Sequence, residues 1–526
     1  MLNSNKFYIT TTLPYVNSDP HLGFALEMVQ ADCIARYHRD VLNQEIFFNT
    51  GTDEHGQKIY QKAQENKQDV QVYVDRYADK FKKLMPALGI LPEIHFIRTT
   101  NVNHIAAAQE FWRICEKNCD IYKKNYKTKY CVGCELGKTE SELIDDKCPI
   151  HPNLELEIRE EENYFFRWSK YQQPLLDLYQ KQPDFVVPGF RFNEIKEFVK
   201  NGLEDFSVSR LKEKMSWGIP VPGDENHVMY VWFDALINYI STLGWGEESR
   251  KSEVGSRSDD GLSDSPILRF SDFWGTQKKP NAIQIAGKDN LRQQSAMWQA
   301  MLMSAGLPNS KQIIIHGFIT SGGQKMSKSL GNAADPYEIL AKLESLGLTK
   351  EQATDALRYY LLREIPTFED GDYTWEHFVE TYNAGLANGI GNLTSRILKM
   401  AVNASLTPVS FVPSSPGEEK RSASGGQMRS NGNNLNQLLN NYELAKAADE
   451  IWKKIQTCDQ FIQKEEPFKK IKVDAGAAKK DIEFLLGELE SIAQSLKPFL
   501  PNTAEQILVA LKDLTLENIP RLFPRI

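Results

Sequence analysis

The chain has 526 residues, which is more than one hydrophobic core usually organises, so we expect two to four domains. Its 41% hydrophobic and 25% charged residues are typical of a soluble globular protein. A net charge of −8 excludes a general electrostatic attraction to nucleic acid, so any RNA contact must use local patches.

The start of the chain and its cysteines favour a cytoplasmic protein. A strand-like run begins at Phe7, which leaves no room for a signal peptide. No apolar stretch approaches the roughly 18 residues that a membrane span needs. The seven cysteines do not form a pattern typical of disulfides in so long a chain. We therefore expect a reducing cytoplasm and no contact with a membrane.

The first predicted elements are a strand, a turn and a helix. The run FYITTT at 7–12 is β-branched or aromatic, and prolines then break the chain. Apolar residues recur on one helical face of the next segment, at Leu22, Leu26, Val29 and Cys33. Strands at 282–286 and 313–315, with a helix-like stretch at 293–305, continue the alternation. This order predicts an α/β, Rossmann-type domain with ligands at the carboxyl ends of parallel strands.

Changes in composition divide the chain further. The region 118–228 contains a cysteine-rich segment, an acidic run and clustered aromatics, which indicates a domain inserted between two halves of the sheet, 1–117 and 229–330. A short linker fold at 331–375 is expected to precede a helical domain at 376–526, where strand signals are few. Segments 247–266 and 410–434 have the composition of disordered surface insertions.

The turn Pro20-His21-Leu22-Gly23 lies between the first strand and its helix. Unpaired backbone N–H groups and the positive end of a helix dipole attract phosphate at such a position. His21 can then donate to a phosphoryl oxygen, and Gly23 lets a nucleotide approach the backbone. The alternative is a histidine that caps the helix.

A second motif, Lys325-Met326-Ser327-Lys328-Ser329, follows the pair Gly322-Gly323 and is expected in a mobile loop. Its two ammonium groups and two hydroxyls can follow the charge of a departing pyrophosphate. The alternative is a solvated pair of lysines on a surface loop.

A third cluster has the spacing of a tetrahedral zinc site: Cys131, Cys134, Cys148 and His151. Four protein ligands leave no position for water, so we expect one zinc ion with a structural role. The alternative is a set of reduced cysteines near a turn. Cys115 and Cys119 lie one helical turn apart without further ligands, and we interpret them as structural thiols.

These motifs resemble a known family. PHLGF is similar to the HIGH signature, and KMSKS matches the second signature, of class I aminoacyl-tRNA synthetases. Within that class the chain resembles the methionyl-tRNA synthetases through ITTTLPYVNSDPHLG, GTDEHG, WGIPVPGD, YVWFDALINYI, GKD, HGFITSGGQKMSKSLGN and YNAGLANGIGNLTSR, in the family's order. The alternatives are an enzyme for isoleucine, valine or leucine, whose editing insertion would be larger, and a silent tRNA-binding relative. Phe24 favours the latter, because the family usually has a second signature histidine there.

The resemblance implies ligation of L-methionine to methionine tRNA with ATP, through methionyl-adenylate. His21, Lys325 and Lys328 would be catalytic, and Mg²⁺ would accompany ATP. The implied ATP-binding residues are His21, Gly23, Glu27, Lys325, Ser327, Lys328 and Ser329. The implied methionine-binding residues are Leu13, Tyr15, Asp53, Trp232, Ala235, Leu236, Tyr239 and His316. Asp53 would hold the ammonium, Leu236 stands where several relatives have proline, and His55 is as readily structural as functional.

The resemblance also implies an anticodon-binding domain at 376–526. Leu386, Ile390, Leu393 and Ile397 form an apolar stripe at helical spacing. A polar row on the opposite side, with a later aromatic, would read the anticodon: Asn388, Asn392, Arg396 and Phe468. The alternative for this row is an ordinary solvated helix face. We expect a monomer, since no dimerising module follows the helical domain.

Overall fold

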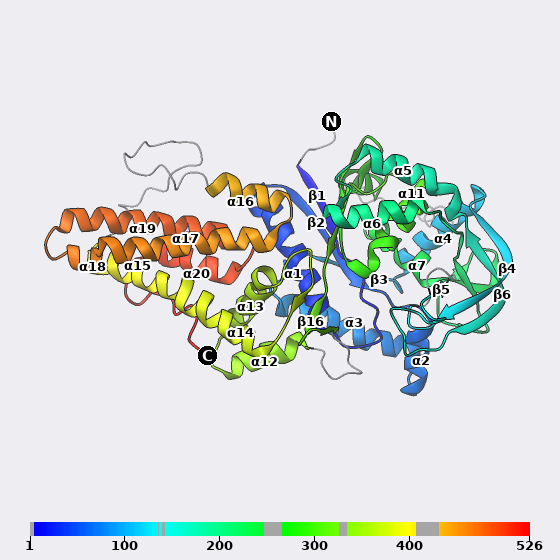
Figure 1. Cartoon of the computed structure of the whole chain (residues 1–526), viewed down its shortest axis with the longest axis horizontal. Helices are drawn as coiled ribbons and strands as arrows, with labels where there is room; N and C mark the ends of the chain where they lie inside the picture. The colour runs from blue at the N-terminus through cyan, green and yellow to red at the C-terminus, as the bar shows by residue number, and fades with distance from the viewer. Residues whose placement is uncertain (1–4, 135, 139–142, 247–265, 326–333, 407–430) are drawn as a thin grey trace, which may run out of the picture. The chain divides into compact units, whose positions relative to one another are not determined.

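The computed structural model of the chain describes residues 5–134, 136–138, 143–246, 266–325, 334–406 and 431–526 (Figure 1). They form two compact units. Unit 1 comprises Met1–Asp19, Ile46–Lys83 and Glu93–Ile315, and unit 2 comprises Pro20–Glu45, Leu84–Pro92 and His316–Ile526. No helix among the described residues is long and apolar enough to cross a membrane.

Unit 1 is built around a six-stranded sheet with the order β3-β2-β1-β14-β15-β7. The pairs β1–β14, β2–β3 and β15–β7 are parallel, which confirms the predicted parallel sheet. Its strands are β1 (Lys6–Thr10), β2 (Glu45–Thr52), β3 (His95–Arg98), β7 (Val186–Val187), β14 (Ala282–Gly287) and β15 (Gln312–His316). All residues of β14 and β15 are buried, as expected for strands that are covered on both faces.

The helices of unit 1 follow the predicted alternation. They are α2 (Gln57–Glu65), α4 (Val102–Lys117), α5 (Gln172–Lys181), α6 (Gly189–Lys200), α7 (Val231–Ala235), α8 (Asn238–Ser241), α10 (Pro266–Phe273) and α11 (Trp298–Ser304); α3 (Val70–Ala87) begins in unit 1 and ends in unit 2. A π-helical segment, η5 (Gln293–Met297), precedes α11, so the expected helix at 293–305 is present with a wider first turn.

Antiparallel strands fill much of the region 118–228. A long hairpin of β4 (Ile121–Cys131) and β6 (Glu157–Phe166) lies in a sheet with the order β5-β4-β6-β8. The other antiparallel strands of this region are β5 (Leu136–Lys138), β8 (Phe206–Ser207), β9 (Ser209–Leu211), β10 (Pro220–Val221) and β11 (Asp224–Met229). Strand β7, which also lies in this region, forms an edge of the parallel sheet. Later in unit 1, β12 (Gly275–Thr276) and β13 (Lys279–Pro280) form a separate antiparallel pair.

Unit 2 is mainly helical. Its elements are α1 (Leu22–Arg36), β16 (Ile319–Ser321), β17 (Gln324–Lys325), α12 (Pro336–Ser345), α13 (Lys350–Tyr359), β18 (Gly371–Asp372), α14 (Trp375–Thr381), α15 (Asn392–Asn403), α16 (Asn431–Asn440), α17 (Leu444–Glu465), α18 (Pro467–Lys470), α19 (Ala475–Leu496) and α20 (Pro501–Lys512). Figure 1 shows α15, α17, α19 and α20 side by side. Helices dominate after Tyr373, as predicted.

The predicted apolar face of α1 is present, but nearly the whole helix is buried, including the polar Gln30 and Asp32. A helix buried on all sides needs internal partners for its polar residues. Of the two low-complexity segments, 247–265 and 410–430 lie outside the described residues.

Candidate functional site

The turn before α1 presents His21 to solvent. His21 occupies the N-cap position with extended backbone angles, φ −129° and ψ 168°, but its side chain makes no capping hydrogen bond. The capping alternative is therefore wrong. A Cβ atom added at Gly23 would lie 3.0 Å from the His21 ring, so the glycine leaves room for the imidazole.

The same turn is bonded to the first described residue that follows the lysine motif in the sequence. The backbone N–H of Leu22 donates to the carbonyl of Ala334 at 3.0 Å, and Ala334 is the first described residue after that motif. On the other side of the motif, Lys325 ends the antiparallel hairpin of β16 and β17. Ser327, Lys328 and Ser329 lie outside the described residues.

Positive backbone φ angles explain the glycine pair in this hairpin. Gly322 and Gly323 have φ values of 60° and 75° at its turn, a conformation that favours glycine. The carboxylate of Asp372 accepts from the N–H of Gly323 at 3.0 Å and from the Thr320 hydroxyl at 2.6 Å. The pKa of Asp372 is lowered by these hydrogen bonds, so the hairpin turn is fixed by an ionised carboxylate.

Glu27 and His316 form a buried pair in unit 2. His316 ends β15, and its Nε2 lies 2.9 Å from Oε2 of Glu27 on the second turn of α1. Its Nδ1 lies 2.7 Å from the carbonyl oxygen of Gly317. Both ring nitrogens therefore lie within hydrogen-bond distance of an oxygen acceptor. The structure thus joins one residue implied for ATP to one implied for methionine.

Leu13, Tyr15 and Asp53 lie together in unit 1. Tyr15 and Asp53 form a parallel β-bridge, in which the Asp53 N–H donates to the Pro14 carbonyl and the Val16 N–H donates to the Asp53 carbonyl. Asp53 is 7% exposed, whereas Leu13 and Tyr15 are half-buried. The backbone therefore holds the proposed ammonium ligand beside two proposed walls of the methionine site.

The other implied methionine-binding residues of unit 1 lie on α7 and α8 or between them. Trp232 is half-buried, and Ala235 is 6% exposed. Leu236 and Tyr239 are more deeply buried and belong to the hydrophobic core. The Tyr239 hydroxyl accepts a hydrogen bond from Gln294 at 2.6 Å, which fixes the ring.

A buried, hydrogen-bonded cluster of polar side chains was not predicted from the sequence. The carboxylate of Asp234 on α7 lies between two histidines, with Oδ2 2.6 Å from His55 Nδ1 and Oδ1 2.8 Å from His104 Nε2. His104 Nδ1 lies 2.9 Å from the Ser241 hydroxyl. Burial alone would raise the pKa of Asp234, but the two histidines outweigh it and the pKa is lowered. GTDEHG pointed to His55, whereas no local pattern pointed to His104.

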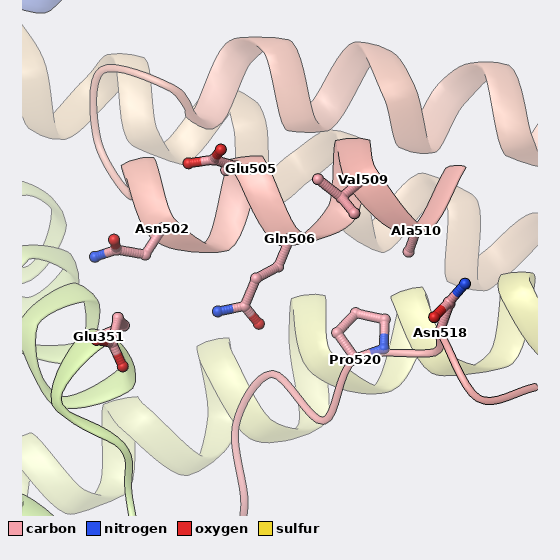
Figure 2. A pocket seen from close by; sticks show the side chains of 8 residues that line it. All are labelled: Glu351, Asn502, Glu505, Gln506, Val509, Ala510, Asn518 and Pro520. Carbon is pink, nitrogen blue, oxygen red and sulfur yellow. The ribbon is translucent and has the colours of Figure 1, made fainter. Parts of the chain in front are cut away.

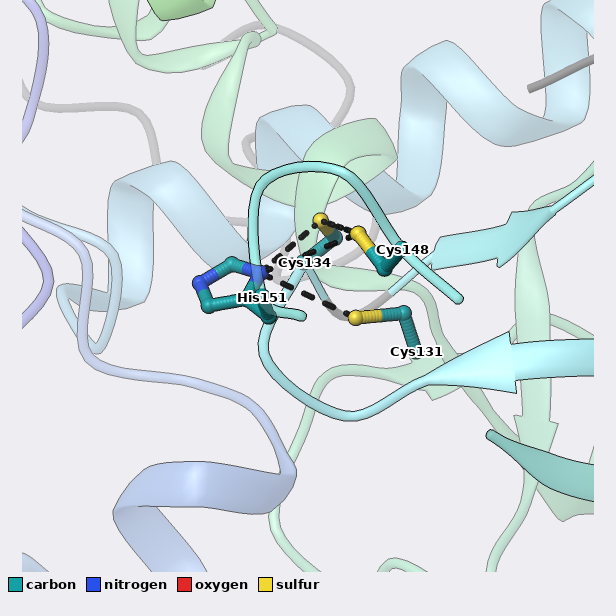
Figure 3. Close-up of side chains that lie close together, drawn as sticks. All are labelled: Cys131, Cys134, Cys148 and His151. Atoms are coloured by element: carbon teal, nitrogen blue, oxygen red, sulfur yellow. Dashed lines mark hydrogen bonds between the residues drawn. The ribbon is translucent and has the colours of Figure 1, made fainter. Parts of the chain in front are cut away.

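The predicted metal ligands form one cluster at the end of β4 (Figure 3). The ligand atoms of Cys131, Cys134, Cys148 and His151 all lie within 4.8 Å of one another. The Cys134 and Cys148 sulfurs are 3.5 Å apart, and His151 Nδ1 lies 3.3, 3.7 and 4.0 Å from the sulfurs of Cys134, Cys131 and Cys148. Tetrahedral zinc would separate two sulfurs by about 3.8 Å and a sulfur from a nitrogen by about 3.6 Å. The cluster therefore fits zinc.

Two neighbours, Gly133 and Lys58, fix the shape of this candidate zinc site. A Cβ atom added at Gly133 would lie 2.4 Å from the His151 ring, so only glycine fits there. The Gly133 carbonyl accepts from Lys58 on α2. Burial raises the pKa of the Cys134 thiol to about 12, and the neighbouring Cys148 and Cys131 add to this, so a Cys134 thiolate would need a cation beside it.

The predicted apolar stripe of the helical region is confirmed, since Leu386, Ile390, Leu393 and Ile397 are fully buried. The polar row on the other side is interrupted. Gly389 has non-helical angles, φ −86° and ψ −107°, between Asn388 in the π-helical segment η8 (Tyr382–Gly391) and Asn392 at the start of α15. Both asparagines are exposed.

Two members of the row are bonded within the chain. Asn388 Oδ1 accepts from Arg525 Nη2 at 2.6 Å, and Arg396 Nη1 donates to Asp459 Oδ1 at 2.7 Å. Phe468, on α18, is 45% exposed. An aromatic ring with this exposure can stack on an unpaired base.

Figure 2 shows a shallow hollow of unit 2 next to α13 and α20. It is lined by polar and apolar side chains, none of which belongs to a predicted site: Glu351, Asn502, Glu505, Gln506, Val509, Ala510, Asn518 and Pro520.

Similarity to known proteins covers nearly the whole chain. The family model described as tRNA synthetases class I (M) matches residues 7–152 and 134–398, and the anticodon binding domain of methionyl tRNA ligase matches 414–521. A methionine–tRNA ligase of Thermotoga maritima is 38% identical over 95% of this chain and 74% of its own length. One of Thermosynechococcus vestitus is 39% identical over 96% of this chain and 89% of its own.

Solved structures agree with these relatives. Methionyl-tRNA synthetase of Mycobacterium tuberculosis in complex with methionyl-adenylate has a TM-score of 0.81 and 32% identity, covering 96% of this chain and 93% of that chain. Its apo form has a TM-score of 0.75 and 30% identity, covering 96% and 91%. The chain therefore belongs to the methionyl-tRNA synthetases, a family of class I tRNA synthetases.

Proposed function

We propose that the chain activates methionine with ATP and joins it to methionine tRNA in two steps. First, a methionine carboxylate oxygen attacks the α-phosphorus of ATP, and the bond to pyrophosphate breaks to give methionyl-adenylate. Second, a ribose hydroxyl of the terminal adenosine attacks the carbonyl carbon, and AMP leaves. Neither step needs a covalent protein intermediate, so catalysis rests on orientation and charge stabilisation. Membership of the family supports this activity.

The hydrogen bond from Leu22 to Ala334 carries the assignment of the nucleotide site. It joins the His21 turn to the segment that follows the lysine motif, although the two are far apart in the sequence. An imidazole and two ammonium groups would then surround one triphosphate, and His21, Lys325 and Lys328 would stabilise its developing charge. Gly23, Glu27, Ser327 and Ser329 would complete the ATP site, and Mg²⁺ would enter bound to ATP.

The methionine site follows from the residues beside Asp53. The Asp53 carboxylate would bind the ammonium group, and the backbone of Leu13 would assist it. The remaining implied walls are Tyr15, Trp232, Ala235, Leu236, Tyr239 and His316. An apolar wall distinguishes side chains that differ by one methylene by only about 1–3 kcal/mol, so homocysteine should be activated at times and need editing.

The remaining assignments concern tRNA and the domains. Residues 1–117 with 229–330 would be catalytic, 118–228 would place the acceptor end, 331–375 would connect, and 376–526 would read the anticodon. The anticodon contacts would come from Asn388, Asn392, Arg396 and Phe468. We place the enzyme in the cytoplasm, as a monomer with one structural zinc.

Methionine-dependent exchange of pyrophosphate into ATP tests this function. Lys325→Ala and Lys328→Ala should each lower the exchange rate by ~10²-fold or more with little change in methionine affinity, because the motif follows the pyrophosphate. Lys350→Ala, which removes an exposed lysine at the start of α13, should keep the wild-type rate. Exchange with isoleucine only would indicate another enzyme of the class, and exchange with no amino acid would indicate a silent relative.

A further inference from the structure

The buried, hydrogen-bonded cluster of His55, Asp234 and His104 joins three separate segments of unit 1. His55 lies two residues after Asp53, in the loop that follows β2. Asp234 is in the middle of α7, between Trp232 and Ala235. His104 is in the first turn of α4. One carboxylate therefore connects both proposed parts of the methionine site to a third element.

The charge of Asp234 determines which nitrogen of each neighbouring imidazole carries a hydrogen. An ionised carboxylate only accepts hydrogen bonds, so His55 must carry a hydrogen on Nδ1 and His104 must carry one on Nε2. Asp234 and His104 have no exposed surface, and His55 is 5% exposed. Each distance, 2.6 Å and 2.8 Å, is that of a strong bond to a charged acceptor.

A second pair of side chains, Asn49 and Asn238, also connects the segment of Asp53 to α7 and α8. The Asn49 amide on β2 donates to Asn238 Oδ1 at 3.1 Å, and the Asn238 amide donates to the Ala235 carbonyl at 2.7 Å. Asn49 precedes Asp53 and His55 follows it. The segment that carries Asp53 is thus bonded to α7 and α8 on both sides of that residue.

We propose that His55, Asp234 and His104 are positioning residues for methionine, holding α7 at a fixed distance from the loop of Asp53. The inference rests on the methionine site proposed above and adds three residues that act through Asp53 and Trp232. A buried carboxylate usually stabilises a fold no more than apolar residues of its size would. Its two oxygens do fix direction and distance, which an apolar side chain cannot do.

The test measures methionine affinity in the full-length protein, by exchange kinetics and by calorimetry with L-methionine alone. His55→Leu should raise the KM and Kd for methionine by about 10- to 100-fold, while kcat and the KM for ATP change by less than about threefold. His55→Asn places a carboxamide nitrogen near the position of Nδ1, so it should restore most of the affinity. His104→Leu and His104→Gln form a second pair with the same expectation.

His227→Leu is the matched control. His227 is also buried in unit 1 and also bonds an aspartate, with Nδ1 3.0 Å from Asp224 Oδ2, but it lies on β11. Its loss should lower the melting temperature without a selective change in methionine affinity. A folded His55→Leu with wild-type methionine affinity would overturn the inference, as would equal losses for methionine, ATP and kcat. If His55→Leu does not fold, the His104 pair decides by the same criteria. Absence of methionine exchange in the wild-type protein would instead overturn the proposed function.

Discussion

The two units hold buried carboxylates in different ways. In unit 1, Asp234 accepts from two imidazoles, and Asp120 accepts from two hydroxyls and one exposed lysine. In unit 2, Asp32 on α1 is paired with two guanidinium groups, those of Arg36 at 2.7 Å and Arg358 at 2.8 Å. Imidazoles and hydroxyls can change their hydrogen positions when a partner changes, whereas a buried guanidinium stays charged and needs an anion.

In unit 2, the buried guanidinium of Arg358 binds several segments of the chain at once. Arg358 has no exposed surface, and its guanidinium donates to the carbonyls of Leu88, Pro498 and Phe499 as well as to Asp32. One side chain on α13 thereby joins the helix after the His21 turn to the corner between α19 and α20. Unit 1 instead has several weaker bonds and the candidate zinc site, so the two units should respond differently to single substitutions.

Removal of the metal should have the largest effect, confined to unit 1. We expect about one zinc per chain, and none in Cys131→Ala, because a structural zinc contributes on the order of 10 kcal/mol or more to local folding. Amide hydrogen exchange should accelerate in β4 and β6 and stay unchanged in α15–α20. Cys119→Ala, which removes an exposed thiol outside the cluster, should keep its zinc. A metal-free protein with a protected hairpin would show that thiols and hydrogen bonds suffice there.

Arg358→Met should have the next largest effect, in unit 2. The substitution leaves the Asp32 carboxylate buried with one cation instead of two, and loss of a buried partner costs about 3–5 kcal/mol. Hydrogen exchange should rise in α1, α13 and α20 together, since these elements share the side chain. Lys453→Met, at an exposed ion pair on α17, should change neither amide hydrogen exchange nor the melting temperature. Exchange that rises in α13 alone would mean that Arg358 does not join the helices.

The features predicted from sequence are those set by short spacing. The four candidate zinc ligands span 21 positions, from Cys131 to His151, so their spacing alone indicated the site. Alternation of strands and helices indicated the parallel sheet, and helical spacing indicated the stripe that includes Leu386 and Ile397. The order of motifs along the chain indicated the family.

The features that sequence did not predict depend on contacts between distant residues. His104 and Asp234 are 130 positions apart, and Arg358 and Phe499 are 141 apart. In the sequence His104 and Arg358 look like ordinary polar residues of amphipathic helices. Their burial becomes evident only when the helices are packed, as does the break at Gly389 in the row that includes Asn388 and Asn392. Lys328 stays a prediction, because it lies outside the described residues.

We expect the smallest effect on stability from Asp120→Asn, and its comparison with Asp32→Asn distinguishes a carboxylate bonded to hydroxyls from one paired with guanidinium groups. In Asp120→Asn the amide oxygen can still accept from the hydroxyls of Tyr171 and Ser304, which lie 2.6 and 2.8 Å from Oδ2, while the exposed Lys170 turns to solvent. The free energy of unfolding should therefore fall by about 1–2 kcal/mol. Asp32→Asn, the same change in unit 2, leaves two guanidiniums facing a neutral amide and should cost at least twice as much in denaturant unfolding. Equal costs for both variants would mean that packing around each carboxylate, rather than the charge of its partners, determines the stability of the two units.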